Sequence, residues 1–181
     1  MMAGYRNQPQ KIAESIAPDG WLHSGDIGSL DEMGFLEIVD RKKELIINAA
    51  GKNMSSANIE QQLKHASPLI GQAVPIGERR PYNVALIVLD PDASAAFSQR
   101  HRLADSSPAA MSIEPQVLEE VTAGVERANE RLSRVERIER FKVLPRDWPR
   151  AGDELTPTMK LKRVSIAEKY AAEIEAMYGV T

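Results

Sequence analysis

Residues 20–60 (GWLHSGDIGSLDEMGFLEIVDRKKELIINAAGKNMSSANIE) constrain the fold most, because short apolar segments alternate there with turn-forming residues. Residues 21–30 and 35–39 are rich in apolar side chains, and a short charged segment that contains glycine separates them. Two apolar runs joined by such a turn are typical of a β-hairpin. We therefore expect a hairpin with a charged tip at this point.

A second pattern follows the charged run at residues 40–43. Residues 44–47 have the composition of a short strand, and Gly51 can adopt the positive φ that a tight turn requires. Ser55 or Ser56 can then cap a helix whose apolar residues recur four positions apart. The sequence predicts a strand, a turn and a helix in that order.

The remaining residues alternate between strand and helix patterns. Apolar residues 73–76 and 83–89 flank the polar loop GERRPY, which predicts an antiparallel pair. Further signals predict helices over residues 92–102 and 114–134, a strand over 141–144, and a last helix with Ile166, Tyr170, Ile174 and Met177 on one face. The predicted fold class is α+β: a small sheet of short strands with helices packed on one or both of its faces, preceded by the hairpin.

Composition excludes several kinds of function. The chain has 181 residues, of which 43% are hydrophobic, enough for one ordinary core with a small flanking piece. Its 23 Lys and Arg residues nearly balance 26 Asp and Glu residues, so no overall field draws the chain to nucleic acid. It has no cysteine, and its three histidines lack the spacing of a zinc site, so we expect no metal site.

The hydropathy pattern predicts no transmembrane segment. The longest apolar run covers residues 84–89, far short of the roughly 20 residues that span a bilayer. Residues 1–20 carry charges and lack the apolar stretch of a leader peptide. We expect a cytoplasmic chain, and peripheral contact with a membrane stays open.

Asp26 is a candidate binding residue. It lies between two glycines in HSGDIG, a setting that can hold the backbone in a turn and fix the direction of the carboxylate. A carboxylate held in this way can accept two hydrogen bonds from a vicinal diol such as a ribose. The alternative is an ordinary turn aspartate, since Asp and Gly dominate turns for structural reasons.

Lys160 is a candidate catalytic residue in TPTMKLKR, between a proline-containing loop and a helix. A lysine on a loop can carry positive charge into a cleft and stabilise a developing negative centre. The alternative is a basic start to the helix, which the helix dipole disfavours.

Two further features have both a structural and a functional interpretation. The run Asp40 to Lys43 is either a solvated edge or a hinge, since hinges are a few residues at the ends of elements. Gly51 either only permits a turn or also lets a narrow ligand pass close to the backbone. Neither GxGxxG nor GxxxxGK[ST] occurs, so this chain has no familiar phosphate loop.

Four segments share the order and spacing of one family. They are GWLHSGDIG, GFLEIVDRKKELI, GKNMSSANIE and PTMKLKR. Together they resemble the carboxyl-terminal part of adenylate-forming acyl-CoA synthetases over essentially the entire chain. The TPTMKLKR segment and the helical insertion near residues 92–134 are most similar to the long-chain fatty-acid–CoA ligases.

The resemblance implies a reaction shared between two domains. The family joins a fatty acid to ATP as an acyl-adenylate, releases pyrophosphate, and then lets CoA displace AMP to give the thioester. Residues 1–42 resemble the tail of the large amino-terminal adenylation domain, and residues 43–181 the small mobile carboxyl-terminal domain. ATP or AMP, CoA and Mg²⁺ are then expected in the full enzyme, and none bound to this chain alone.

The resemblance also implies roles for five positions. Asp26 would hold the ribose hydroxyls, and Arg41 would lie near the same ribose or phosphate. Lys43, the last residue of DRKK, would be the hinge. Lys160 would reach the α-phosphate and the acid carboxylate during adenylation, and the Gly51 turn would lie beside CoA during thioester formation.

Two departures from the family pattern matter. Met159 precedes the late lysine where many relatives have glycine, which predicts a stiffer loop. The phosphate loop, the acid pocket and the magnesium-binding acidic residue of the large domain have no counterpart here, so we expect the chain alone to be inactive. The alternative hypothesis is a stand-alone interaction module that binds a partner synthetase or an acyl carrier without catalysis.

Overall fold

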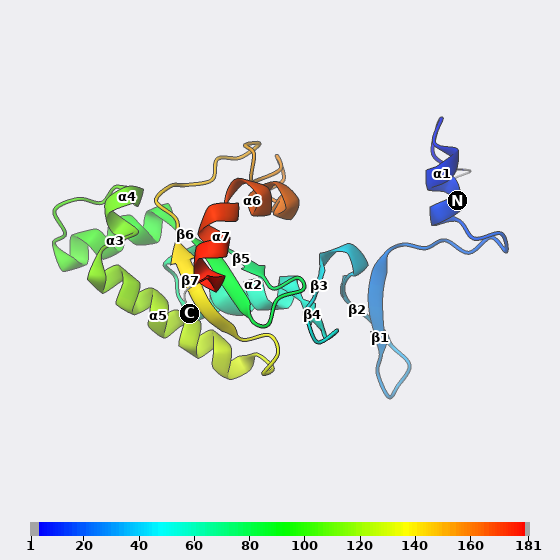
Figure 1. The fold of residues 1–181 in the computed structure, drawn as a ribbon, viewed down its shortest axis with the longest axis horizontal. Helices are drawn as coiled ribbons and strands as arrows, with labels where there is room; N and C mark the ends of the chain where they lie inside the picture. The colour runs from blue at the N-terminus through cyan, green and yellow to red at the C-terminus, as the bar shows by residue number, and fades with distance from the viewer. Residues whose placement is uncertain (1–3, 180–181) are drawn as a thin grey trace. The chain divides into compact units, whose positions relative to one another are not determined.

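The computed structural model describes residues 4–179, except for the side chains of Val39, Asp40 and Lys43. The chain divides into two compact units, Met1–Leu45 and Ile46–Thr181 (Figure 1). The predicted hinge residue Lys43 lies shortly before this division, and its side chain lies outside the described part.

The first unit holds a short helix and the predicted hairpin. Its elements are α1 (Pro9–Ser15), β1 (Asp26–Leu30) and β2 (Leu36–Arg41). The strands pair antiparallel from Asp26 opposite Arg41 to Leu30 opposite Leu36. At the tip, the carboxylate of Asp31 accepts the N–H groups of Met33 and Phe35 at 2.9 and 2.8 Å. The hairpin and its charged tip are therefore confirmed.

The first predicted strand is wrong over residues 21–25. Only Leu22 pairs there, in an isolated bridge with Ile16. Gly20 and Gly25 adopt φ of 88° and 79°, which turns the backbone away from an extended conformation on both sides of this segment.

The second unit is built on a three-stranded sheet. Its strands are β5 (Ile70–Ile76), β6 (Asn83–Leu89) and β7 (Ile138–Val143), in the order β5-β6-β7. β5 and β6 are antiparallel, as predicted, whereas β7 runs parallel to β6. All seven residues of β6 are buried, which explains its nearly continuous apolar sequence.

Helices cover both faces of this sheet. They are α2 (Ser56–Ala66), α3 (Pro91–His101), α4 (Pro108–Met111), α5 (Pro115–Arg131), α6 (Arg163–Lys169) and α7 (Ala171–Tyr178). Ala85 and Ile87 of β6 share a core cluster with residues of α2 and α5. Val84 and Leu86 belong to a second cluster with residues of α6 and α7. The alternation of side chains along β6 thus divides the core into two layers, and the predicted α+β fold class is confirmed.

A small hairpin precedes α2. A 3₁₀ turn, η1 (Lys42–Glu44), leads into β3 (Leu45–Ile47), which pairs with β4 (Asn53–Ser55). The hydroxyl of Ser55 accepts the N–H of Asn58 at 3.0 Å and caps α2, as predicted. β4 and α4 were not predicted.

The predicted last helix is two helices. Tyr170, with φ −106° and ψ 25°, separates α6 from α7. Ile166, Tyr170, Ile174 and Met177 are nevertheless all buried. The apolar spacing continues across the break, so periodicity could not reveal it.

No helix within residues 4–179 combines the length and apolar character needed to cross a bilayer.

Candidate functional site

Asp26 and Arg41 meet at the open end of the β1–β2 hairpin. They are direct cross-strand partners, and the Nε of Arg41 lies 3.0 Å from the Oδ1 of Asp26. The Arg41 side chain is 65% exposed and the Asp26 side chain 24%. The register of the hairpin therefore places a carboxylate and a guanidinium side by side at the surface, as partners for hydroxyl and phosphate groups.

A hollow of about 990 Å³ opens beside this pair within the first unit. Its lining is mostly polar and comprises Tyr5, Gln10, Lys11, Glu14, Ser15, Leu22, His23, Ser24, Gly25, Asp26, Arg41 and Lys42. The structure thus brings together the two residues that sequence reasoning assigned to the nucleotide, and residues of α1 also line the hollow.

Lys43 lies in the 3₁₀ turn between β2 and β3. The N–H of the preceding Lys42 donates to the carbonyl of Gly25 at 2.8 Å, which fixes the start of this turn to the first unit. A short 3₁₀ turn of this kind is a common connector between two elements.

Gly51 lies at the tip of the β3–β4 hairpin, with φ of 72°. Its N–H donates to the carbonyl of Asn48 at 2.9 Å, and the Asn48 side chain accepts the N–H groups of Ala50 and Lys52. Apart from Gly51 and its two neighbours in the chain, no heavy atom lies within 4 Å of the position that a Cβ would occupy on Gly51. The turn therefore needs glycine for its backbone, and open space surrounds it.

Lys160 lies in a narrow exposed loop whose two sides meet at an isolated bridge between Leu155 and Leu161. Within the loop, the N–H of Thr156 donates to the carbonyl of Lys160 at 2.9 Å, and the N–H of Lys160 donates to the hydroxyl of Thr156 at 3.0 Å. Met159 has φ of 63°. This left-handed conformation favours glycine, so Met159 is held there at some cost in backbone strain.

The amine of Lys160 is presented outward. Its side chain is exposed, and no hydrogen bond or ion pair holds its Nζ among the described residues. The loop is therefore ordered by its backbone, while the charged end remains available to an external anion.

A buried polar network, which sequence reasoning missed, lies at the base of this loop. Glu154 is 3% exposed, and its Oε1 accepts hydrogen bonds from Lys169 Nζ at 2.7 Å and from the Tyr170 hydroxyl at 3.1 Å. The indole N–H of Trp148 donates to the same hydroxyl at 3.0 Å. Burial alone would raise the pKa of Glu154, but the hydrogen bonds from Lys169 and Tyr170 hold it below its ordinary value. The signal in the sequence was an acidic pair, Asp153 and Glu154, just before the basic KLKR segment.

The carboxyl-terminal end of the loop is fixed by a second ion pair. Arg163, the first residue of α6, donates through Nη2 to Glu60 Oε2 on α2 at 2.8 Å. The two side chains are only 23% and 19% exposed. The basic start of α6, which the helix dipole disfavours, is thus neutralised by a partner from another helix.

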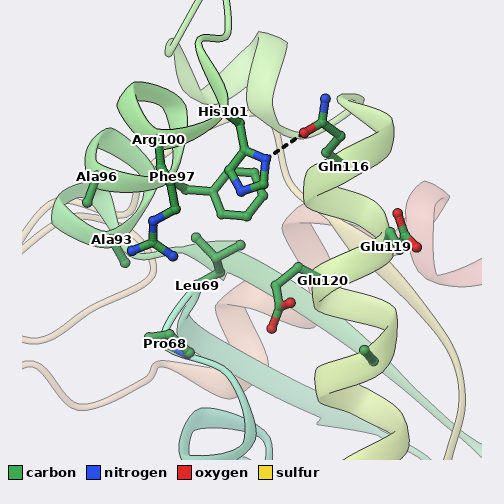
Figure 2. Close-up of a pocket in the computed structure, with 11 residues that line it drawn as sticks. Pro68, Leu69, Ala93, Ala96, Phe97, Arg100, His101, Gln116, Glu119 and Glu120 are labelled. Carbon is green, nitrogen blue, oxygen red and sulfur yellow. Dashed lines mark hydrogen bonds between the residues drawn. The ribbon is translucent and has the colours of Figure 1, made fainter.

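A separate hollow of about 650 Å³ lies between α3 and α5 (Figure 2). His101 stacks on Phe97 and its Nδ1 lies 2.7 Å from the Oε1 of Gln116 at one end of the hollow. None of the site residues predicted from the sequence lines it. This hollow is therefore separate from the candidate site.

Fold and site together define an α+β domain that presents a lysine on an ordered surface loop. The model of the AMP-binding enzyme C-terminal domain family matches residues 43–181, and the chain belongs to this family.

Relatives of known type support the same assignment. The chain is 53% identical over 179 residues to the putative fatty-acid–CoA ligase fadD11 of Mycobacterium tuberculosis, covering 99% of this chain and 31% of that protein. It is 44% identical to the long-chain-fatty-acid–CoA ligase FadD15 of the same species and 38% identical to human ACSBG1, over 99% and 97% of this chain and 30% and 26% of theirs. The resemblance found in the sequence is confirmed, and the chain spans less than a third of the length of these relatives.

Solved structures share the fold. The A domain of the carboxylic acid reductase of Segniliparus rugosus, in complex with AMP and a co-purified carboxylic acid, matches with a TM-score of 0.79 at 21% identity, over 99% of this chain and 26% of that one. The o-succinylbenzoate CoA synthetase MenE of Bacillus subtilis, in complex with AMP, matches with a TM-score of 0.60 at 26% identity, over 91% of this chain and 27% of that one.

Proposed function

We propose that this chain acts as the carboxyl-terminal part of a long-chain fatty-acid–CoA ligase and supplies Lys160 to the formation of the acyl-adenylate. The observation that carries the proposal is the exposed amine of Lys160 on a loop ordered by its own backbone. The ordered loop limits where the amine can lie, and a cation close to the charge that develops in a transition state stabilises it.

In the adenylation step, a carboxylate oxygen of the fatty acid attacks the α-phosphorus of ATP, and pyrophosphate leaves. Both reactants are anionic, and negative charge is spread over the α-phosphate oxygens in the transition state. The ammonium of Lys160 would neutralise part of that charge and bring the two anions together. In this proposal the role of Lys160 is electrostatic, and no proton is transferred.

In the second step, the sulfur of CoA attacks the carbonyl carbon of the acyl-adenylate, and AMP leaves. In our proposal Lys43 is the pivot between residues 1–42, the tail of the large domain, and residues 43–181, the mobile domain. The pivot exchanges the Lys160 loop for the Gly51 turn at the reaction centre. The open space around Gly51 would then admit the narrow arm of CoA.

Asp26 and Arg41 are proposed to bind the nucleotide throughout. The carboxylate of Asp26 would accept hydrogen bonds from the ribose hydroxyls, and the exposed guanidinium of Arg41 would donate to ribose or phosphate oxygens. The fatty-acid pocket and the ligands of Mg²⁺ are assigned to the large adenylation domain.

The first unit has a surface suited to that partner. Six apolar side chains in and beside its hairpin are between 57% and 81% exposed: Trp21, Leu30, Met33, Phe35, Leu36 and Ile38. This number of exposed large apolar side chains within one small unit is typical of a surface that another protein surface covers. The large domain is the occupant that the family assignment favours.

A reconstitution experiment tests the proposal. Purified chain mixed with ATP, Mg²⁺, palmitate and CoA should release no pyrophosphate, and adding the large domain of the Mycobacterium tuberculosis relative should restore release. Turnover by the chain alone would contradict the dependence on a second domain. Binding measured by light scattering without any turnover would instead favour an interaction module.

A further inference from the structure

We propose that Glu154 is a positioning residue for Lys160, acting through the stem of the loop. The inference rests on the proposed function of Lys160 and adds a residue to which neither the sequence pattern nor the relatives assign a role. It concerns the placement of the amine and not its chemistry.

The backbone of Glu154 closes the stem. Its carbonyl accepts the N–H of Lys162 at 2.8 Å, next to the bridge between Leu155 and Leu161. Leu155 is 1% exposed, so the stem is fixed to the core on this side. The two sides of the stem that carries Lys160 therefore meet at Glu154.

The side chain of Glu154 connects that stem to the junction of α6 and α7. Lys169 is the last residue of α6 and Tyr170 separates the two helices, and both donate to the same carboxylate oxygen. A buried carboxylate without partners would be strongly unfavourable, so these two donors hold it in one place. The junction in turn packs in the core cluster that contains Leu86 of β6.

Displacement of the stem would also move the amine of Lys160. The hydrogen bonds between Thr156 and Lys160, and from the N–H of Met159 to the carbonyl of Thr156, make the tip move with its stem. A misplacement of about 1 Å can lower a reaction rate on the order of a hundredfold. The anchoring of Glu154 therefore bears directly on the adenylation step.

Asp153 provides a matched control. It lies next to Glu154 in the sequence and pairs with the same ammonium of Lys169 at 3.1 Å. Its side chain is 79% exposed, whereas that of Glu154 is 4% exposed. Both changes, Glu154→Gln and Asp153→Asn, remove one negative charge beside Lys169, but only the first disturbs the buried anchor.

The activity test uses full-length Mycobacterium tuberculosis fadD11 in which this chain replaces the matching segment; we call this protein the hybrid enzyme. Glu154→Gln should lower kcat of adenylation, measured by ATP–pyrophosphate exchange, by about tenfold or more, with KM for ATP little changed. Thioester formation from supplied acyl-adenylate should stay within about twofold for both variants, and Asp153→Asn should also adenylate within about twofold of the parent. Ile59→Val, a substitution in the core on α2, serves as a control for general destabilisation. It should affect adenylation and thioester formation equally.

A second measurement uses the chain alone. Hydrogen exchange at the amides of Met159 and Lys160 should be faster in Glu154→Gln than in Asp153→Asn, while the amides of β6 exchange alike. If Glu154→Gln does not fold, Tyr170→Phe takes its place, because it removes one donor to the carboxylate and keeps the ring.

The outcomes separate the two proposals. If Lys160→Ala leaves adenylation intact, the proposed function is wrong. The amide exchange of Met159 and Lys160 then tests the anchoring on its own: faster exchange in Glu154→Gln than in Asp153→Asn supports it, and equal exchange contradicts it. If Lys160→Ala abolishes adenylation but Glu154→Gln behaves like Asp153→Asn in both measurements, the positioning role is wrong.

Discussion

Replacing Gly51 by alanine is expected to destabilise the protein through the backbone alone. The left-handed conformation at φ 72° costs a residue with a side chain about 1–2 kcal/mol. Alanine also restricts the unfolded chain, which returns roughly 0.4–1 kcal/mol. No steric term is added, because no heavy atom beyond the adjacent residues lies within 4 Å of the new Cβ. We therefore expect the free energy of unfolding to fall by about 1 kcal/mol.

Urea unfolding of a short series at this position tests the reasoning. Gly51→Asn should cost less than Gly51→Ala, because asparagine tolerates the left-handed region, and Gly51→Val should cost most, because a β-branched residue avoids it. The m-value should stay the same across the series, since little buried surface changes. Equal costs for all three variants, or none for alanine, would refute backbone strain as the cause.

The rate of thioester formation gives a second measurement on the Gly51 variants. If the Gly51 turn lies beside CoA, Gly51→Val should slow thioester formation from supplied acyl-adenylate in the full-length hybrid enzyme. Adenylation should be largely spared. Loss of adenylation instead would contradict the assignment of this turn to the second step.

Four further predictions concern the loop, its anchors and the response to pH. Met159→Gly should change the free energy of unfolding by less than about 1 kcal/mol in denaturant, because relief of left-handed strain opposes the entropy cost of glycine, and a loss above about 2 kcal/mol would be inconsistent. Arg163→Ala should cost about 1–3 kcal/mol, since it leaves the half-buried Glu60 without its partner, and adding Glu60→Ala should recover part of the loss. The folded state holds the pKa of Glu154 below its ordinary value of 4.5, so its stabilising contribution should be present above that pH and disappear on acidification, and Glu154→Gln should flatten the acidic limb of the stability curve. Burial raises the pKa of Tyr178 from 10.0 to about 12, so the unfolded state ionises first and stability should fall between those values, a fall that Tyr178→Phe should remove.

The sequence predicted the elements that have strong local signals. The hairpin tip at Asp31, the serine cap of α2 and the antiparallel partners β5 and β6 each depend on a few adjacent residues, and each is confirmed. Tertiary contacts decided what was missed. β4 (Asn-Met-Ser) has a single apolar residue and is a strand because it pairs with β3. The parallel pairing of β7 with β6 joins residues more than fifty positions apart.

The candidate site was predictable in part. Asp26 and Arg41 were singled out separately, and only the register of the hairpin shows that they form one ion pair. Lys160 was visible from its basic segment. Glu154 was not, because its importance comes from burial and from partners 15 and 16 residues further along the chain, which no local pattern encodes.

The most direct test of the account replaces Lys160 by alanine in the full-length hybrid enzyme and measures the two half-reactions separately. We expect acyl-adenylate formation to fall on the order of a hundredfold to a thousandfold, the usual loss when one preorganised charge-stabilising group is removed. Thioester formation from supplied acyl-adenylate should change by less than about threefold, as should both steps in the exposed-lysine control Lys64→Ala. Equal losses in the two half-reactions of Lys160→Ala, or no loss in either, would contradict the role assigned to this lysine.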